Sequence, residues 1–306
     1  MKHIISAQQF LDRSVVDAVF ASAASLEAAE AEGSRQPYCA GKLLATVFYE
    51  PSTRTRFSFE TAMYRLGGEV ITSESASMFS SAVKGETIED TMRVVSGYAD
   101  VIALRHPKEG TAAAAAKASS VPVINAGDGA GEHPTQALLD YFTMQKEQGS
   151  VDGLHIAFIG DLLYGRTVHS LLYLLPIFKN VRVSLISPAE LRLPAKFREY
   201  LQTNKIAFTE ATELNSIIDS ADVFYVTRVQ KERFSAEADY NAVKDIYVIN
   251  SAVVGGMKPR AIIMHPLPRV NEIAPEVDAD TRAAYFRETR NGVFVRMALL
   301  KDVLGR

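Results

Sequence analysis

Short apolar runs alternate with segments of helical periodicity from one end of the chain to the other. Runs of this kind, bounded by polar residues, glycine or proline, predict buried strands, and the segments between them predict helices. The predicted strands cover 43–49, 69–73, 101–105, 121–126, 155–160, 181–186, 223–227, 246–250 and 262–265. The predicted helices cover 58–66, 86–98, 111–119, 134–147, 166–178 and 194–203. This alternation predicts an α/β fold with parallel sheets covered by helices on both faces.

The number of predicted strands and a change in composition indicate two domains rather than one. Residues 147–153, Glu-Gln-Gly-Ser-Val-Asp-Gly, form the best candidate linker. We therefore expect two doubly wound parallel-sheet domains, one over 1–148 and one over 149–289. A helix at about 290–306 is expected to pack back on the first domain. Because polar strand ends cluster in both halves, we expect one active site in the cleft between the domains.

Composition and charge narrow the class of protein. With 306 residues, 47% hydrophobic content and a net charge of −3, the chain has the composition of a soluble globular protein. The negative charge argues against a nucleic-acid binder that works by neutralising phosphates. The single cysteine, Cys39, excludes an internal disulfide and suits a reducing compartment. Since neither a secretory signal nor an apolar run of membrane-spanning length is recognisable, we expect a cytoplasmic protein without a membrane partner.

The polar segment after the first apolar run predicts an anion site. It contains Ser52, Thr53, Arg54, Thr55 and Arg56, directly before a helical pattern. A helix N-terminus offers unpaired backbone N–H groups and the positive end of the helix dipole, and hydroxyl and guanidinium groups add further donors. Arginines in a first turn oppose that dipole, which favours a bound anion over the alternative of a solvated, N-capped turn.

Other polar side chains of the first half also follow strand ends, where ligands bind in open parallel sheets. Arg105 ends one apolar run, and we interpret it as a ligand-binding residue. The alternative is that its guanidinium only reaches solvent from the edge of a sheet. His133 precedes a helix and could simply cap it. Gln136 lies one helical turn further on and would point to the same place, which makes the two interpretations of His133 equally good.

The second half repeats this arrangement at three strand ends. Residues 160–167, Gly-Asp-Leu-Leu-Tyr-Gly-Arg-Thr, have the spacing of a P-loop, but Arg166 replaces its lysine, so we interpret Arg166 as a fork for a carboxylate or phosphate. Arg228 and Gln230 would share one side of an extended segment, unless 227–233 is only a solvated charge run. Residues 265–268, His-Pro-Leu-Pro, predict a rigid turn, with a cis proline as one option, whose carbonyls could orient an amine.

Together these segments resemble the motifs of the carbamoyltransferases, and in particular the family of aspartate carbamoyltransferase catalytic chains. The resemblance covers nearly the whole chain in the right order. Its motifs are Pro51-Ser52-Thr53-Arg54-Thr55-Arg56, Arg105-His106-Pro107, His133-Pro134-Thr135-Gln136, Gly165-Arg166, Thr227-Arg228-Val229-Gln230 and His265-Pro266-Leu267-Pro268-Arg269. Ornithine carbamoyltransferases look like His-Cys-Leu-Pro at the last motif and lack the Thr-Arg-Val-Gln-Lys-Glu-Arg segment.

The resemblance implies transfer of a carbamoyl group from carbamoyl phosphate to L-aspartate, an early step of pyrimidine biosynthesis, without a metal or another cofactor. It implies that carbamoyl phosphate is bound by Ser52, Thr53, Arg54, Thr55, Arg105, His133, Gln136, Leu267 and Pro268. It implies that aspartate is bound by Lys84, Arg166, Arg228, Gln230 and Leu267. The residues implied in catalysis are Arg54, Thr55, Lys84, Arg105 and His133, and those implied in domain closure are Glu50, Arg166 and Arg233.

The resemblance also implies a homotrimer, in which Ser80 and Lys84 reach the site of a neighbouring subunit. It leaves open whether a separate regulatory chain joins the trimer. Three alternative functions remain: carbamoyl transfer to ornithine or an acylated ornithine, a non-catalytic assembly scaffold, and nucleotide hydrolysis. A dicarboxylate acceptor needs arginine forks, which Arg166 and Arg228 supply, whereas a cationic acceptor would need acidic residues there.

Overall fold

The computed structural model of the chain describes residues 2–75, 85–129, 131–230, 240–241 and 243–305. The chain folds into two compact units. Unit 1 comprises Met1–Leu139 with Arg290–Arg306, and unit 2 comprises Asp140–Thr289. The chain passes from one unit to the other within α6 (Pro134–Gln148) and within α11 (Tyr285–Val303). The boundary expected from the sequence, after residue 148, coincides with the end of α6, whereas the boundary between the compact units falls inside that helix.

Unit 1 contains a four-stranded parallel sheet in the order β2-β1-β3-β4. Its strands are β1 (Leu43–Phe48), β2 (Glu69–Glu74), β3 (Val101–His106) and β4 (Val123–Asp128). The central strands β1 and β3 are buried along nearly their whole length, as their continuous apolar sequences require. β2 lies at one edge of the sheet and is largely exposed, which explains its mixed sequence.

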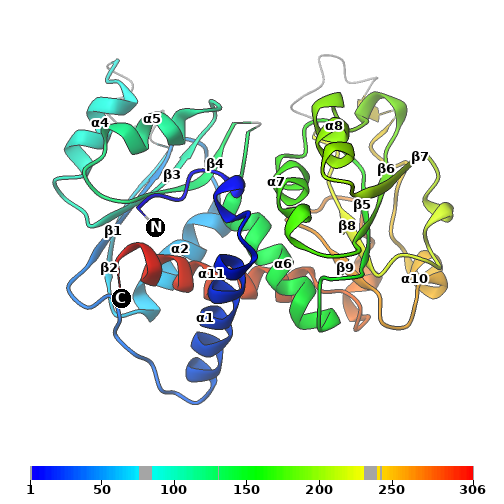
Figure 1. Ribbon diagram of the computed structural model, residues 1–306, viewed down its shortest axis with the longest axis horizontal. Coiled ribbons are helices and arrows are strands. Elements are labelled where there is room, and N and C mark those ends of the chain that lie inside the picture. Colours follow the sequence, from blue (N-terminus) through cyan, green and yellow to red (C-terminus); the bar gives the residue numbers. More distant parts are fainter. Residues whose placement is uncertain (1, 76–84, 130, 231–239, 242, 306) are drawn as a thin grey trace. The chain divides into compact units, whose positions relative to one another are not determined.

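Helices cover both faces of this sheet, as the sequence predicted (Figure 1). α4 (Ile88–Val95) and α5 (Thr111–Ala118) lie on one face, where Met92 and Ala115 pack against Ala45, Ile102 and Leu104. α2 (Thr53–Arg65) contacts β1 and β2 from the other face, on which α11 also lies (Figure 1). α1 (Arg13–Ala31) completes the unit.

Unit 2 contains a five-stranded parallel sheet in the order β7-β6-β5-β8-β9. Its strands are β5 (His155–Ile159), β6 (Arg182–Ile186), β7 (Ala207–Ala211), β8 (Val223–Val226) and β9 (Ile262–Met264). The strand order turns back at β5, which has β6 on one side and β8 on the other. A reversal of this kind opens a crevice at the carboxyl ends of the strands, and β1 has the same position between β2 and β3 in unit 1.

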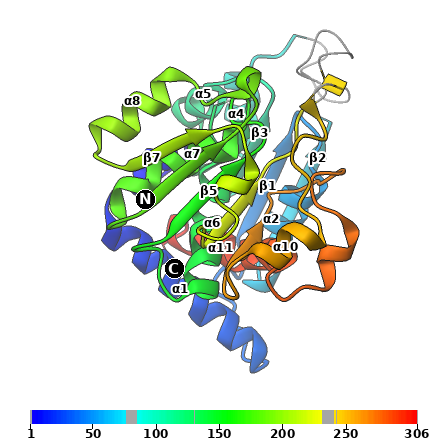
Figure 2. The ribbon, with the colours of Figure 1, turned by 90° about the vertical axis from the view of Figure 1, so that its right-hand side faces the viewer.

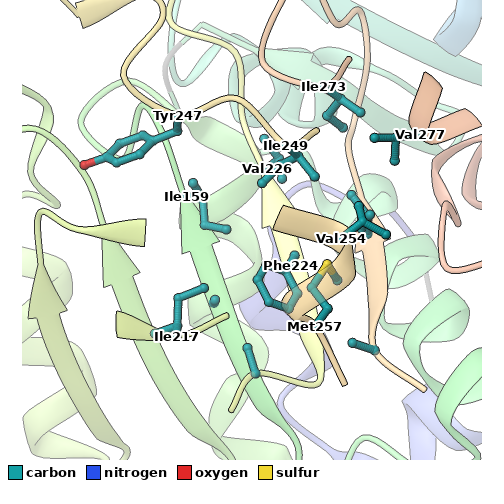
Figure 3. Packing of buried hydrophobic residues seen from close by; sticks show 14 of the residues in the cluster. Ile159, Ile217, Phe224, Val226, Tyr247, Ile249, Val254, Met257, Ile273 and Val277 are labelled. Carbon is teal, nitrogen blue, oxygen red and sulfur yellow. The ribbon is translucent and has the colours of Figure 1, made fainter. Parts of the chain in front are cut away.

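The second sheet also has helices on both faces (Figures 1 and 2). α7 (Arg166–Leu174) and α8 (Ala195–Thr203) lie on one face and pack on each other through the stacked rings of His169 and Phe197. α10 (Ser251–Gly256) lies on the opposite face (Figure 2). Figure 3 shows that Phe224 and Val226 of β8 meet Val254 in the apolar core of that face. Short 3-10 helices span Ala7–Phe10, Leu175–Ile177, Ala189–Leu191, Leu214–Ser216 and Pro275–Ala279.

Two parts of the strand prediction are wrong. The apolar segment 246–250 forms no regular strand; Ile249 makes only an isolated bridge to Ile273 and is buried by packing. β7 was not predicted, because Ala207–Ala211 is an exposed edge strand without an apolar run. α2 also begins earlier than expected, at Thr53, since Ser52 adopts the extended N-cap conformation. In the described parts of the chain, every helix is too short or too polar to cross a membrane.

Candidate functional site

The turn from β1 into α2 has the geometry of an anion-binding helix start. Ser52 occupies the N-cap position with an extended backbone, and its hydroxyl does not cap the helix. The first-turn N–H groups of α2 therefore stay available, together with the positive end of the helix dipole. The side chains of Thr53 and Arg54 are exposed at this end, whereas Thr55 is buried. The helix therefore begins within the polar segment, with Thr53 and Arg54 exposed at its start.

The two arginines of this turn differ in their surroundings. Partial burial lowers the pKa of the Arg54 guanidinium, and no carboxylate in the described part of the chain pairs with it. Arg56 instead lies 3.1 Å (Nη2–Oε2) from Glu74 of β2 and 3.9 Å (Nε–Oε1) from Glu60. The hypothesis that both arginines need an external anion is therefore wrong for Arg56, which carboxylates of its own unit neutralise. Arg54 keeps its charge for a ligand.

Arg105 is a buried cation in the interior of the first sheet. Only 7% of the residue is exposed, and β3 lies between β1 and β4, so the alternative of a guanidinium reaching solvent from a sheet edge is excluded. Its Nη2 donates to Glu50 Oε1 at 2.7 Å and its Nη1 donates to the Ala126 carbonyl at 3.3 Å. The guanidinium thus contacts the carboxyl ends of both neighbouring strands.

His133 and Gln136 follow the adjacent strand, β4. His133 is 3% exposed and directly precedes α6, and its carbonyl accepts the N–H groups of Gln136 (3.0 Å) and Ala137 (3.2 Å). These bonds at the start of α6 are therefore made by the backbone of His133 and not by its imidazole. Because Gln136 lies one helical turn on, the two side chains share a side of α6.

A carboxylate and a glycine hold the loops of this edge. Asp128 Oδ1 accepts from Asn125 Nδ2 at 3.1 Å, and Asp128 Oδ2 accepts the Gly110 N–H at 3.0 Å, which joins the segments after β3 and β4. Gly129 has φ +53°, and a Cβ there would lie 2.6 Å from the Glu109 nitrogen. A larger residue at this position would push the two loops apart. Contacts within the protein therefore hold the loops at this edge of the sheet together.

In unit 2, the segment between β5 and α7 is built as a self-contained loop. Gly160 has φ +110°, and a Cβ there would lie 2.4 Å from the Thr227 carbonyl, so the ends of β5 and β8 are in close contact. Asp161 is fully buried, and its Oδ1 accepts the Tyr164 N–H at 2.9 Å. A P-loop needs such amides for phosphate, and a buried carboxylate would repel it, which argues against nucleotide binding here. Arg166 is half-buried at the first position of α7.

The segment after β8 has the alternation that the sequence predicted. Val229 is buried, whereas Arg228 and Gln230 on either side of it are half-buried. Gln230 Nε2 donates to the Tyr164 carbonyl at 3.2 Å, which ties this segment to the loop before Arg166. Residues 227–230 are therefore not a solvated charge run, whereas the remainder of the segment 227–233 lies outside the described residues. Arg228 and Arg166 follow the carboxyl ends of neighbouring strands, β8 and β5.

The turn after β9 is held by a buried histidine–carboxylate pair. The Leu267–Pro268 peptide bond is cis, which confirms the expectation of a cis proline. His265 Nδ1 accepts the Leu267 N–H at 2.7 Å, so Nε2 carries the proton and donates to Glu272 Oε1 at 2.7 Å. Glu272 Oε2 also accepts the N–H groups of Val270 and Asn271, each at 3.1 Å. Burial alone would raise the pKa of Glu272, but the hydrogen bond from His265 and those from backbone N–H groups bring it below its usual value.

A second buried carboxyl, that of Glu288, hydrogen-bonds the backbone at the start of the same turn. Glu288 Oε2 accepts the His265 N–H at 2.9 Å, and Glu288 also hydrogen-bonds the side chain of Asp140. Asp140 Oδ2 accepts from the Tyr225 hydroxyl at 2.8 Å. Burial, and then the charge of Asp140, raise the pKa of Glu288 well above its usual value. The proton on Glu288 is therefore held more tightly than that of a solvent-exposed glutamate.

The candidate residues therefore fall into two sets, one at each sheet edge. The set of unit 1 follows β1, β3 and β4 and comprises Ser52, Thr53, Arg54, Thr55, Arg105, His133 and Gln136. The set of unit 2 follows β5, β8 and β9 and comprises Arg166, Arg228, Gln230, Leu267 and Pro268. Ser80, Lys84 and Arg233 lie outside the described residues. Glu50, expected in domain closure, contacts Arg105 within its own unit.

The sequence analysis missed residues that support the candidate site without being part of its motifs. Glu272 holds His265, and Glu288 holds the backbone at the end of β9. Arg296 of α11 contacts both α2 and α6. One signal was present: Arg296 is a lone cation in the apolar stretch Phe294–Ala298.

Two family models together match nearly the whole chain. The carbamoyl-P binding domain of aspartate/ornithine carbamoyltransferases matches residues 2–146. The Asp/Orn binding domain of the same family matches residues 152–303. The two matches meet near the end of α6.

Individual proteins show the same similarity at high identity. The chloroplastic aspartate carbamoyltransferase of Arabidopsis thaliana is 50% identical over 99% of this chain and 78% of its own length. The catalytic subunit of Methanocaldococcus jannaschii aspartate transcarbamoylase superposes with a TM-score of 0.93 at 50% identity, over 100% of this chain and 98% of that one.

A structure with both substrates is also similar. The Trypanosoma cruzi aspartate transcarbamoylase in complex with carbamoyl phosphate and aspartate superposes with a TM-score of 0.92 at 42% identity, over 99% of this chain and 95% of that one. The fold of each unit, the polar residues at both sheet edges and these matches agree. The chain therefore belongs to the aspartate/ornithine carbamoyltransferase family.

Proposed function

We propose that this protein transfers the carbamoyl group of carbamoyl phosphate to the amino group of L-aspartate. The products are N-carbamoyl-L-aspartate and phosphate, and the reaction would serve pyrimidine biosynthesis. The observation that carries the proposal is the edge of the first sheet, where the start of α2, Arg105 and His133 follow strands that are direct neighbours. The similarity to aspartate carbamoyltransferases over nearly the full chain supports the choice of substrates.

The start of α2 supplies the phosphate subsite in this proposal. Ser52, Thr53 and Thr55 offer hydroxyl and backbone donors, and Arg54 offers a guanidinium whose charge is not neutralised by a described carboxylate. Phosphate is bound well by such a combination of helix N-terminus and arginine. Arg54 therefore both binds the leaving group and stabilises the negative charge that it gains as it departs.

The carbamoyl carbonyl is polarised by Thr55, Arg105 and His133. The aspartate amine attacks the carbonyl carbon, and charge develops on the carbonyl oxygen in a tetrahedral intermediate. The new C–N bond forms, the C–O bond to phosphate breaks, and the departing phosphate takes up the proton that the amine gives up. Fixed donors that point at the developing oxyanion accelerate such a step because they need no rearrangement during the reaction. Gln136 binds the carbamoyl amine.

Aspartate is bound by the edge of the second sheet in this proposal. Arg166, Arg228 and Gln230 hold its two carboxylates, and the backbone at Leu267 and Pro268 orients the amino group and the carbamoyl amine. Guanidinium forks match carboxylates in geometry and charge. Both substrates are anionic, so fixed cations must offset their mutual repulsion although the chain as a whole carries −3. Glu50, Arg166 and Arg233 are proposed to pair when the substrates are bound.

We propose a homotrimer in which Ser80 and Lys84 complete the site of a neighbouring subunit. The support is the family membership and the position of 80–86 in the sequence. The test is to mix two inactive variants, Lys84→Ala and Arg54→Ala, after reversible dissociation. Shared sites predict that activity returns, because some hybrid sites receive neither substitution. Activity that stays absent in hybrids of confirmed trimeric mass would contradict shared sites.

We also propose that the protein is cytoplasmic, and that it be examined for a regulatory partner chain. The single cysteine is compatible with a reducing compartment. The relative from Methanocaldococcus jannaschii is named a catalytic subunit, which supports a search for a partner chain. The mass of the native assembly, isolated from its own source, decides between a lone trimer and a larger complex.

The central test compares two arginines from one helical turn. Phosphate release from carbamoyl phosphate is measured with aspartate and with ornithine, for the wild type, Arg54→Ala and Arg56→Ala. We expect turnover with aspartate, a loss of roughly 10²–10³-fold in Arg54→Ala, and less than about threefold in Arg56→Ala. Turnover only with ornithine would contradict the proposed acceptor. Full biological activity of Arg54→Ala would favour the scaffold alternative.

A further inference from the structure

Arg296 is a buried cation on a helix that carries none of the predicted catalytic residues. It is 3% exposed and lies among the buried residues Val295 and Met297 of α11. Burying a guanidinium is costly unless its donors are satisfied by well-placed partners. Its environment in unit 1 must therefore be specific, and its partners show what that environment serves.

The partners of Arg296 lie on two different helices. Nη1 donates to Ser58 Oγ of α2 at 2.9 Å, and Nη2 donates to Thr135 Oγ1 of α6 at 3.3 Å. The guanidinium carbon also lies 5.1 Å from the centre of the Phe59 ring of α2. Because a guanidinium is planar and its donors are fixed in direction, one side chain sets the separation of the two hydroxyls.

Both hydroxyls lie close to the candidate catalytic residues along the chain. Ser58 lies one helical turn after Arg54 and Thr55, on the helix whose start forms the proposed phosphate subsite. Thr135 lies between His133 and Gln136 in the first turn of α6. Arg296 therefore joins α2 to α6 through one hydroxyl on each helix, close to the start of each.

We propose that Arg296 is a positioning residue that fixes the start of α2 relative to the start of α6. It thereby holds the phosphate donors of α2 at the distance from His133 that carbamoyl phosphate requires. This inference rests on the proposed function, since it names what sets the geometry of the same site. A displacement of about 1 Å at such a site can lower the rate by roughly 10²-fold, so a fixed spacer matters.

Gly292 offers an independent way to disturb this spacer. It lies one turn before Arg296 on α11, and a Cβ there would lie 2.7 Å from Arg296 Nη1 and 3.0 Å from Leu139 Cδ2. Gly292→Ala would therefore displace the guanidinium while leaving its charge in place. Arg296→Lys also keeps the charge but replaces the fork with a single ammonium group. Both variants therefore test the position and shape of the cationic group while the net charge stays the same.

The experiment measures binding and turnover in four variants: Arg296→Met, Arg296→Lys, Thr135→Val and Gly292→Ala. Arg290→Gln, which removes an exposed cation from the same helix, is the matched control. The Kd of inorganic phosphate is measured by calorimetry, and KM for each substrate and kcat are measured by phosphate release. Thermal unfolding is recorded for every variant, and binding is compared only at temperatures where the protein is folded.

We expect Arg296→Met to weaken phosphate binding about tenfold and to lower kcat by about 10²-fold, with KM for aspartate changed less than about twofold. Arg296→Lys should behave like Arg296→Met, and Thr135→Val and Gly292→Ala should shift phosphate binding in the same direction by about threefold. Arg290→Gln should match the wild type.

Two outcomes overturn the inference. One is a lower melting temperature with phosphate binding within about twofold of the wild type, which would make Arg296 purely structural. The other is wild-type behaviour of both Thr135→Val and Gly292→Ala, which stays decisive even if Arg296→Met fails to fold. A wild type that does not turn over carbamoyl phosphate would instead refute the proposed function.

Discussion

The two sheet edges that carry the candidate residues are built differently. At the edge of unit 1, the residues lie in or next to regular structure: the first turn of α2, the carboxyl end of β3 and the residue before α6. At the edge of unit 2, Arg228, Gln230 and Leu267 lie on loops that side-chain to backbone hydrogen bonds hold in place. The first edge is therefore preorganised by the fold itself. The second depends on a few buried polar groups, so its geometry is open to change by single substitutions.

The largest effect on activity is expected from removing Arg105, the buried cation at the edge of unit 1. Arg105→Ala removes the guanidinium that contacts Glu50 and the end of β4. Loss of a donor to the developing oxyanion should lower kcat by roughly 10²–10³-fold. Steady-state phosphate release measures the effect, and Arg93→Ala, an exposed arginine of α4, is the control. A kcat near that of the wild type would mean that Arg105 has only a structural role.

A substitution at the second edge should affect a different kinetic constant. Arg228→Ala is expected to raise KM for aspartate by roughly 10–100-fold, since hydrogen bonds to a charged group contribute about 1.5–3 kcal/mol. KM for carbamoyl phosphate should stay unchanged. Arg182→Ala, an exposed arginine of β6, is the control. If both KM values rise equally, the division of labour between the two edges is wrong.

The third prediction concerns the network that holds the second edge. Glu272→Gln cannot accept all three N–H groups that Glu272 accepts, from His265, Val270 and Asn271. We expect a loss of about 1–3 kcal/mol in the free energy of unfolding, measured in urea. Because the pKa of Glu272 is lowered in the folded state, its stabilisation is present above the pKa of the unfolded state and is lost as pH falls. Glu276→Gln, at an exposed glutamate nearby, should show neither change.

The smallest effect should come from the proton shared by Glu288 and Asp140. The raised pKa of Glu288 stabilises the folded state below the pKa of the unfolded state, and this stabilisation is lost as pH rises towards the folded value.

Glu288→Gln has no titrating group at this position, but its amide can still donate to Asp140 and its carbonyl can accept the His265 N–H. We therefore expect the stability of Glu288→Gln relative to the wild type to improve between pH 6 and pH 9. Urea unfolding at both values measures it. An equal pH slope in both proteins would show that Glu288 is ionised in the folded state.

Strands and helices with strong patterns were predictable, and weakly patterned ones were not. β1 and β3 are continuous apolar runs, and the structure has them where the sequence predicted. β7 was missed because an edge strand needs no apolar run. Residues 246–250 were assigned to a strand because a short apolar segment looks the same whether it pairs in a sheet or only packs against one.

Some residues of the candidate site could likewise be found from the sequence, and others could not. Arg54, Arg105 and His133 could be found because each follows an apolar run in the sequence, and parallel sheets gather their carboxyl ends at one edge. The sequence places Glu60 at i+4 from Arg56, but it could not show that Glu74 of β2 also lies beside Arg56 and not beside Arg54. Arg296 stands out as a lone cation in an apolar stretch, but the sequence could not identify its partners Ser58 and Thr135, which lie on other helices.

The amino-acid sequence by itself determined which residues can do chemistry and at which strand ends they lie, because hydrophobic periodicity and helix-start chemistry are local properties. Only the tertiary structure decided which charges are neutralised internally and which remain for a ligand. Long-range packing brings Glu74 to Arg56, Glu50 to Arg105, and both Ser58 and Thr135 to Arg296. The strength of an ion pair depends on distance and burial, and neither is contained in a local pattern.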